Sequence, residues 1–211
     1  MSDYKILKKG GDGEIVEKKS RFIAHIVPVE NKEEAMDFVA SMKKKYYDAR
    51  HNCYAYTIGP NDEEFKSSDD GEPSGTAGRP MLEVIKGEGI HNICVVVTRY
   101  FGGVLLGTGG LVRAYTEAVK EGLRNCEVAT LCQGMEYLVE VSYPDLGKLQ
   151  NYCRNENITI EDEQYGEKVL VELILPVEGA DKFEKDLQEL YAGKVVPEKM
   201  GEKSFAKVLS M

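Results

Sequence analysis

The chain has 211 residues, of which 42% are hydrophobic and 30% charged, as expected for a soluble globular protein with one large or two small domains. It contains no apolar run near the roughly 20 residues that a membrane span requires, and its first residues lack the apolar core of a signal peptide. The net charge of −9 argues against a broad electrostatic grip on nucleic acid and against recognition of a DNA sequence.

The charge is divided unevenly along the chain. Residues 1–131 carry 18 Lys/Arg and 20 Asp/Glu, a net charge of −2, whereas residues 132–211 carry 9 and 16, a net charge of −7. An anionic partner is therefore expected to meet the first part of the chain and to be repelled by the second.

The first part predicts a sheet with helices. Residues 14–20 and 21–29 predict a hairpin that turns near Ser20, and Asn31 is placed to cap a helix over residues 32–46. The later predicted elements are a strand over 53–59, a polar loop over 60–74, a short helix over 81–86, a strand over 93–100 and a helix over 108–125. The unbroken apolar run in the strand over 93–100 predicts a central strand buried on both faces.

The second part predicts a β-α-β-β-α-β order, which is that of the ferredoxin-like split motif. Its predicted strands cover 134–143, 158–166, 168–176 and 204–210, and its helices cover 144–153 and 179–193. The sequence therefore predicts an α+β protein with two domains, residues 1–131 and 132–211, whose boundary lies near residues 126–133.

Two polar, glycine-rich stretches lie before and after the predicted central strand. They read SSDDGEPSGTAGRP (67–80) and, beginning at the end of that strand, TRYFGGVLLGTGGLVRAY (98–115). Glycine is required where a Cβ atom would clash or where another group approaches the backbone closely. Both stretches could meet at one end of one sheet, and we place the candidate site there.

The second stretch leads from strand into helix, where backbone N–H groups and the helix dipole can hold an anion. Its glycines are Gly102, Gly103, Gly107, Gly109 and Gly110. The stretch is not a Walker A loop, because Thr108 stands where lysine is needed, and Val112 breaks the dinucleotide-binding fingerprint. The alternative interpretation is that these glycines only allow tight packing of strand against helix.

Charged residues of both stretches have two interpretations each. The carboxylates of Asp69, Asp70 and Glu72 could hold a divalent cation, but a solvated acidic loop with turns is favoured because further ligands are missing. The guanidinium groups of Arg79, Arg99 and Arg113 could bind phosphate or carboxylate, or could neutralise those acids in internal ion pairs.

Evidence for catalysis is weak. His51 and Cys53 would share one face of a strand, yet the sequence indicates no oxyanion donor and no third member of a catalytic triad. The aromatic rings of Tyr54, Tyr56, Tyr100 and Phe101 could stack on nucleic-acid bases, although aromatic residues in strands are more often part of a core. The five cysteines form no CxxC pair, which disfavours zinc and disulfides and favours a cytoplasmic location. We assign no catalytic residue, metal or cofactor.

The blocks HNCYAY, SDDGEPSGTAGRP and TRYFGGVLLGTGGLVRAY resemble the signature blocks of the IMPACT family, specifically its bacterial YigZ-like members. The resemblance covers essentially the whole chain. It matches the family blocks at His51, Asp69 to Pro73, Gly75 to Gly78, Arg99 to Gly103, Gly107, Gly109, Gly110 and Arg113.

The resemblance implies a first domain with the ribosomal protein S5 domain-2-like fold, shared with domain IV of elongation factor G. It implies a second domain that is ferredoxin-like, similar to the last domain of that factor. Eukaryotic relatives regulate translation by binding the activator of an initiation-factor kinase, and they carry an additional N-terminal RWD-type domain. The same fold superfamily includes small-molecule kinases with a glycine-rich phosphate loop. The loop of this chain lacks the serine-rich pattern of those enzymes, so kinase activity is an analogy only.

Three hypotheses of function follow. The leading one is a cytoplasmic, non-catalytic binding protein that acts on translation by contacting the ribosome, RNA or a translation factor. The second is an enzyme or sensor for a phosphorylated or carboxylated small molecule, with Mg²⁺ held by the acidic residues. The third treats the motifs as architectural and places function on an acidic protein-binding face.

Overall fold

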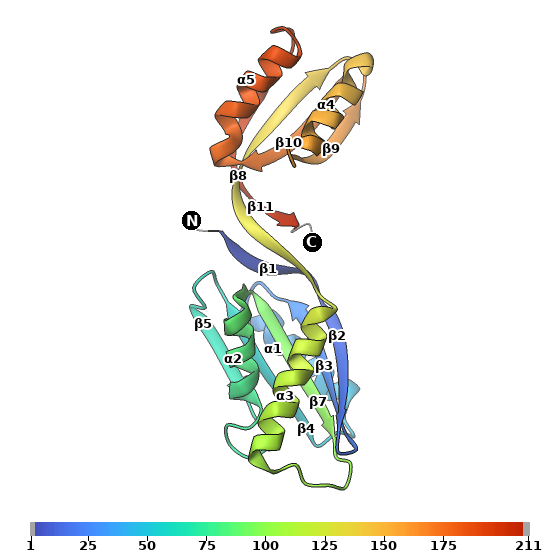
Figure 1. The fold of residues 1–211 in the computed structure, drawn as a ribbon, viewed down its shortest axis with the longest axis vertical. Helices are drawn as coiled ribbons and strands as arrows, with labels where there is room; N and C mark the ends of the chain where they lie inside the picture. The colour runs from blue at the N-terminus through green and yellow to red at the C-terminus, as the bar shows by residue number, and fades with distance from the viewer. Residues whose placement is uncertain (1–2, 209–211) are drawn as a thin grey trace. The chain divides into compact units, whose positions relative to one another are not determined.

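The computed structural model describes residues 3–208. Apart from the two end residues of that range, they form two compact units, residues 4–130 and residues 131–207. The protein is α+β with two sheets, as predicted. Figure 1 follows the chain through the elements of each unit. Strand β8 (Glu127–Val141) is continuous across the residue at which the units divide, so a strand rather than a loop joins them.

The first unit is built on a five-stranded antiparallel sheet with the order β2-β3-β7-β4-β5. These strands are β2 (Gly11–Glu17), β3 (Ser20–Pro28), β7 (Ile93–Tyr100), β4 (His51–Ile58) and β5 (Glu64–Ser68). Strands β1 (Tyr4–Lys9) and β6 (Ile90–His91) are parallel to each other and belong to the other, six-stranded sheet, where β1 is the neighbour of β8. Strand β7 is central and buried along its length except at Tyr100, which confirms the prediction from its apolar run.

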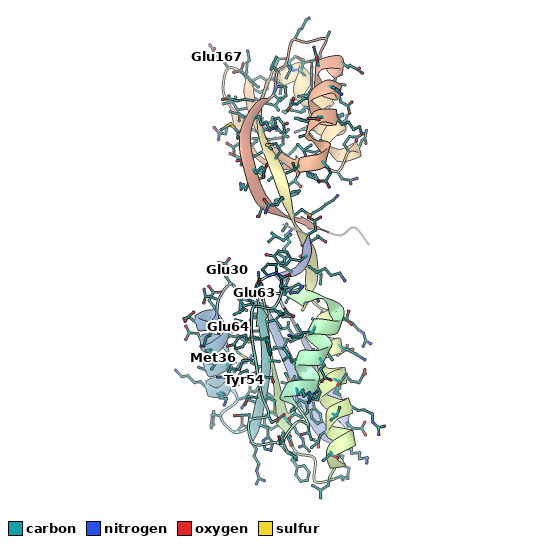
Figure 2. All side chains as sticks on the ribbon, turned by 90° about the vertical axis from the view of Figure 1, so that its left-hand side faces the viewer. Glu30, Met36, Tyr54, Glu63, Glu64 and Glu167 are labelled. Carbon is teal, nitrogen blue, oxygen red and sulfur yellow. The ribbon has the colours of Figure 1, made fainter. Side chains whose placement is uncertain are left out.

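Helices cover both faces of this sheet (Figure 1). Helices α2 (Gly78–Glu88) and α3 (Gly107–Arg124) pack on one face against side chains such as Phe22, Cys53 and Val97. Helix α1 (Lys32–Lys45) packs on the other, where Met36 and Tyr54 lie (Figure 2). Because side chains alternate along a strand, β3, β4 and β7 supply residues to both cores.

Most predicted elements of the first unit are present, and the differences have physical causes. Asn31 caps α1, accepting a hydrogen bond from the Glu34 backbone N–H at 2.9 Å, as predicted. The prediction of one loop over residues 60–74 was wrong, because β5 occupies part of it. Strand β5 reads EFKSS and pairs only with β4 at the sheet edge, so no apolar alternation marks it.

The second unit has the predicted order of elements. After β8 come α4 (Tyr143–Asn155), β9 (Thr159–Tyr165), β10 (Val169–Pro176), the short 3₁₀ helix η1 (Val177–Gly179), α5 (Ala180–Leu190) and β11 (Glu198–Val208). Strand β8 pairs with β10 and β11, and β10 pairs with β9. The last residues of the predicted strand over 204–210 lie outside the described residues.

One core fills the second unit between its helices and one face of its sheet. Leu149 and Cys153 of α4 and Phe183 and Leu187 of α5 pack there against alternate residues of β8 and β10. Among residues 3–208, no helix is both long enough and apolar enough to cross a membrane.

Candidate functional site

The two glycine-rich stretches meet, as predicted, at a buried carboxylate. We call residues 67–80 the acidic segment and residues 101–110 the glycine loop. The side chain of Glu72 is only 3% exposed. Its Oε1 accepts hydrogen bonds from Arg99 Nη1 at 2.6 Å and from the Tyr115 hydroxyl at 2.9 Å. One carboxylate thus ties the acidic segment to the end of β7 and to α3.

Arg99 lies within this cluster rather than on the surface. Its guanidinium carbon is 5.4 Å from the ring centroid of Phe22 and 5.7 Å from that of Phe101, and its residue is 7% exposed. Within the described part of the chain its Nε has no hydrogen-bond partner. A buried ion pair of this kind holds elements together but leaves its charges little access to a ligand.

Asp69 fixes the start of α2. Its carboxylate accepts hydrogen bonds from the backbone N–H groups of Gly75 at 2.8 Å, Ala77 at 3.0 Å and Gly78 at 2.8 Å. Burial alone would raise the pKa of Asp69, but the three N–H donors outweigh it and the pKa is lowered. The carboxylate therefore does the work of an N-cap although it precedes the helix by nine residues.

Asp70 and His51 close the other side of the acidic segment. The Asp70 carboxylate pairs with Lys43 Nζ at 2.5 Å and accepts from the Asn52 backbone N–H at 2.8 Å. His51 Nδ1 is 3.0 Å from the Asp70 carbonyl oxygen, and its Nε2 is 4.0 Å from Glu72 Oε1. The three acids thus point at three different sets of partners, and residues 3–208 contain no group of three or more His, Cys, Asp or Glu arranged to hold a metal ion.

Cys53 shares a sheet face with His51, as predicted, but is a buried thiol. Its Sγ lies 3.0 Å from the Asp69 carbonyl oxygen and 3.3 Å from the Tyr115 hydroxyl. Burial raises the pKa of Cys53 far above its ordinary value, so the thiol stays protonated at neutral pH. Because the thiolate is the nucleophile, this environment disfavours covalent catalysis by Cys53.

The glycine loop is pressed against the turn of the β2–β3 hairpin. The Gly102 backbone N–H donates to Ser20 Oγ at 3.1 Å, and a Cβ atom on Gly102 would lie 2.0 Å from the Lys19 carbonyl carbon. No larger residue fits there. Gly103 and Gly107 have positive φ angles of 84° and 72°, whereas Gly109 and Gly110 lie in the first turn of α3.

The hairpin turn itself has an unusual sequence. Glu17 pairs directly with Ser20, so the turn consists of Lys18 and Lys19, whose φ angles are 45° and 68°. Two positive φ angles define a type I′ turn, which favours Asn-Gly or another glycine-containing pair. Two lysines in this conformation strain the backbone at a point where both side chains are exposed.

The glycine loop, the lysine turn and the start of α3 together form a mixed apolar and cationic surface. We call it the hairpin–loop surface, and its members are Lys18, Lys19, Phe101, Val104, Leu105 and Arg113. Phe101 is 53% exposed, Val104 43% and Leu105 83%. Within residues 3–208, Arg113 is exposed and forms no hydrogen bond or ion pair. Lys18, Gly110 and Arg113 line a common cavity of about 390 Å³.

Two predicted binding residues have local partners of their own. Arg79 forms an exposed ion pair with Glu83, four residues along α2, at 3.0 Å. The Tyr100 hydroxyl donates to the Asp48 carboxylate at 2.8 Å, and its ring faces the Arg21 guanidinium. Neither contacts the Glu72 cluster through a described hydrogen bond or ion pair.

Sequence reasoning missed Tyr115, Ser20, Lys18 and Lys19 as parts of the site. Tyr115 lies in the apolar stripe of α3, and only its hydroxyl group distinguishes it from a core residue. The turn lysines could have been found from the missing glycine: a tight turn between two strands without Asn or Gly is a local conflict in the sequence.

Comparison with known proteins agrees with the motifs. The Impact N-terminal domain matches residues 18–123, and a domain of unknown function (DUF1949) matches residues 139–194. A solved structure described as that of a hypothetical protein is 34% identical, with a TM-score of 0.61, and the match covers 93% of this chain and 97% of that one.

Bacterial relatives match along most of their length. IMPACT family member YvyE of Bacillus subtilis is 42% identical over 92% of this chain and 89% of its own. IMPACT family member YigZ of Escherichia coli is 38% identical over 83% of this chain and 87% of its own. Protein IMPACT of Oryctolagus cuniculus is 37% identical over 44% of this chain and 30% of its own. The chain therefore belongs to the IMPACT family, among its bacterial YvyE- and YigZ-like members.

Proposed function

We propose that this protein is a non-catalytic binding protein that acts on translation by contacting ribosomal RNA through the hairpin–loop surface. The observation that carries the proposal is the contrast between the two stretches. The charges of the acidic segment are taken up by internal partners, whereas the glycine loop and the lysine turn present exposed cations and apolar side chains. A cytoplasmic location agrees with the five free cysteines.

The chemistry of the surface favours RNA over other anionic partners. Lys18, Lys19 and Arg113 can each meet a phosphate, and Phe101 presents a ring on which an unpaired base can stack. Gly103, which has only open space where a Cβ would be, allows a sugar–phosphate backbone to approach closely.

We also assign the finer folds on topology. The strand order β11-β8-β10-β9 corresponds to the 4-1-3-2 order of a ferredoxin-like sheet. For the first unit we propose the ribosomal protein S5 domain-2-like fold implied by its family. Both assignments agree with a role beside a ribosomal factor by analogy of fold alone. The support for the proposal is the chemistry of the hairpin–loop surface.

The proposal is tested by co-sedimentation of the protein with purified ribosomes between low and physiological salt. We expect salt-sensitive binding, and we expect the double variant Lys18→Glu/Arg113→Glu to bind much more weakly. Because this variant removes two cations that would each neutralise a phosphate, the slope of log affinity against log salt should fall by about 2. The matched control is Lys44→Glu/Arg50→Glu, which makes the same charge change on exposed residues of the same unit.

Arg99 is not a suitable position for this test. Its replacement by glutamate would place a second carboxylate against buried Glu72, and loss of binding would then report unfolding. Equal binding by wild type and by Lys18→Glu/Arg113→Glu would contradict the proposed surface, as would an equal reduction of binding in the control.

A second candidate is a sensor of a small phosphorylated or carboxylated molecule. The cavity beside Lys18, Gly110 and Arg113 favours it, but Glu17 and Glu117 line the same cavity and reduce its positive potential. A thermal-shift screen of phosphorylated metabolites separates the candidates, because a ligand at 100 times its Kd stabilises the fold by about 2.7 kcal/mol. Stabilisation by one metabolite without ribosome binding would favour the sensor.

A further inference from the structure

The sheet of the second unit has one face without a helix. Helices α4 and α5 lie together on one face (Figure 1), where Tyr137, Val139, Val171 and Leu173 form the core with them. Neighbouring residues of each strand point to the opposite face. We call this the open face, and its members are Glu136, Leu138, Glu140, Glu161, Asp162, Gln164, Lys168, Leu170, Glu172 and Lys203.

The open face is acidic with an apolar centre. Leu138 is paired in register with Glu172, and Leu170 with Glu140, so leucines and carboxylates alternate between neighbouring strands. Leu138 and Leu170 are both half-buried, while Glu140 and Asp162 are exposed. The face holds five carboxylates and two ammonium groups among the members named above, an excess of three negative charges.

Lysines of the chain itself show how this face holds a cation. Lys203 Nζ lies between two carboxylates, 3.1 Å from Glu136 Oε1 and 2.8 Å from Glu161 Oε2. Lys168 Nζ pairs with Glu140 Oε1 at 2.5 Å. Glu172 and Asp162 lie opposite each other in register, and each accepts only from the neutral amide of Gln164 at 3.2 Å. This second carboxylate pair has no cation of its own among the described residues.

The geometry points to a docking surface for a lysine- and arginine-rich segment of a partner protein. Charge complementarity favours this occupant, because a cationic side chain from outside would pair with Asp162 and Glu172 as Lys203 pairs with Glu136 and Glu161. Its aliphatic stem would cover Leu138, because lysine and arginine lay their methylene groups on apolar surface. RNA is disfavoured, since its phosphates would face the excess carboxylates. The inference does not rest on the function proposed for the first unit.

The test uses the full-length protein and fluorescein-labelled nona-arginine as the probe, followed by fluorescence anisotropy at low salt. The variant is Asp162→Asn/Glu172→Gln, whose amides keep the hydrogen bonds with Gln164. The matched control is Glu178→Gln/Glu189→Gln, which removes the same charge from exposed positions off the open face. We expect the affinity of the variant to fall about fivefold, as two exposed charge pairs imply, and that of the control to change less than about twofold.

Backbone amide chemical shifts locate the contact independently of affinity. On addition of nona-arginine we expect the changes to concentrate at residues 136–140, 161–164 and 170–172. Equal reductions of affinity in variant and control, or shift changes on α4 and α5 instead, would overturn the inference, because the peptide would then report net charge alone. Displacement of the peptide by a nine-nucleotide RNA that shifts the same residues would also overturn it.

Discussion

The acidic segment and the glycine loop differ in how their side chains are held. Both are rich in glycine and adjacent to the end of a strand of the central sheet, but the first is polar and the second is mainly apolar. In the acidic segment, Asp69, Asp70 and Glu72 each have partners inside the first unit. In the glycine loop, Phe101, Val104 and Leu105 are exposed, and Gly103 and Gly107 have open space where a Cβ would lie.

The difference shows what each kind of residue contributes. Carboxylates can accept several hydrogen bonds, so an acidic loop can fold onto its own backbone and become a rigid support. A loop of glycines and apolar residues has no such hydrogen-bonding side chains; Gly102 holds it against the hairpin, and Leu106 packs against the core. We infer that the acidic segment holds the neighbouring elements in position and that the glycine loop makes the contact with a partner. Four predictions test this division of roles.

Removal of the Glu72 carboxylate should have the largest effect. In Glu72→Ala the buried Arg99 guanidinium loses its ion pair and Tyr115 loses its acceptor. An unpaired buried charge costs about 3–5 kcal/mol, so the free energy of unfolding measured with urea should fall by that amount. The double variant Glu72→Leu/Arg99→Leu should recover most of the loss. A change below about 1 kcal/mol in the single variant would mean that the cluster is not a support.

Gly102→Ala should be the next most harmful change. Its Cβ would lie 2.0 Å from the Lys19 carbonyl carbon, so hairpin and loop must separate. Forcing atoms into packed backbone costs about 1–3 kcal/mol, readable as a lower thermal midpoint. Gly109→Ala is the control: it sits in α3 with open space around it and should stabilise by about 0.5–1 kcal/mol. Equal stability of the two variants would contradict the role of Gly102 in holding the glycine loop against the hairpin.

Asp69→Ala should cost about 1–2 kcal/mol at neutral pH, as loss of a helix cap does. The pKa of Asp69 is lowered in the folded state, so its stabilisation is complete above the ordinary value near 3.8 and is lost as pH falls through the folded pKa. The stability difference between wild type and variant should therefore shrink below about pH 4. A difference that stays constant from about pH 7 to about pH 3 would contradict the role of this carboxylate.

Much of the fold could be predicted because its strong signals are local. The apolar run of β7, the Asn31 cap and the β-α-β-β-α-β order of the second unit each lie within one stretch of sequence. Strand β5 could not be predicted, since it is a polar edge strand defined by pairing with β4. The contact between Gly13 and Gly122 could not be predicted either, because these residues are far apart in sequence. A Cβ on Gly13 would lie 2.4 Å from the Gly122 nitrogen.

The site could be located but not resolved from sequence. The glycine patterns correctly predicted that the two stretches meet at one end of the sheet. The sequence left open whether Arg99 and Glu72 bind a ligand or each other. That choice depends on burial, which a single charged residue in a polar stretch does not reveal. The contribution of Lys18 and Lys19 depends on the turn type, which is fixed by the strand register on either side.

The smallest effect on stability should be a gain, in the variant Lys18→Asn/Lys19→Gly. Asn-Gly suits both positive φ angles of this turn, so the hairpin should be stabilised by about 1 kcal/mol, measured as a higher thermal midpoint. If the lysines are kept for contact with RNA, ribosome binding should weaken in the same variant although the fold is more stable. Lys44→Asn/Lys45→Gly, in the last turn of α1, is a matched charge control that should instead lose stability. A more stable variant with undiminished ribosome binding would show that the turn only connects two strands, and would leave Arg113 and the glycine loop to make the contact.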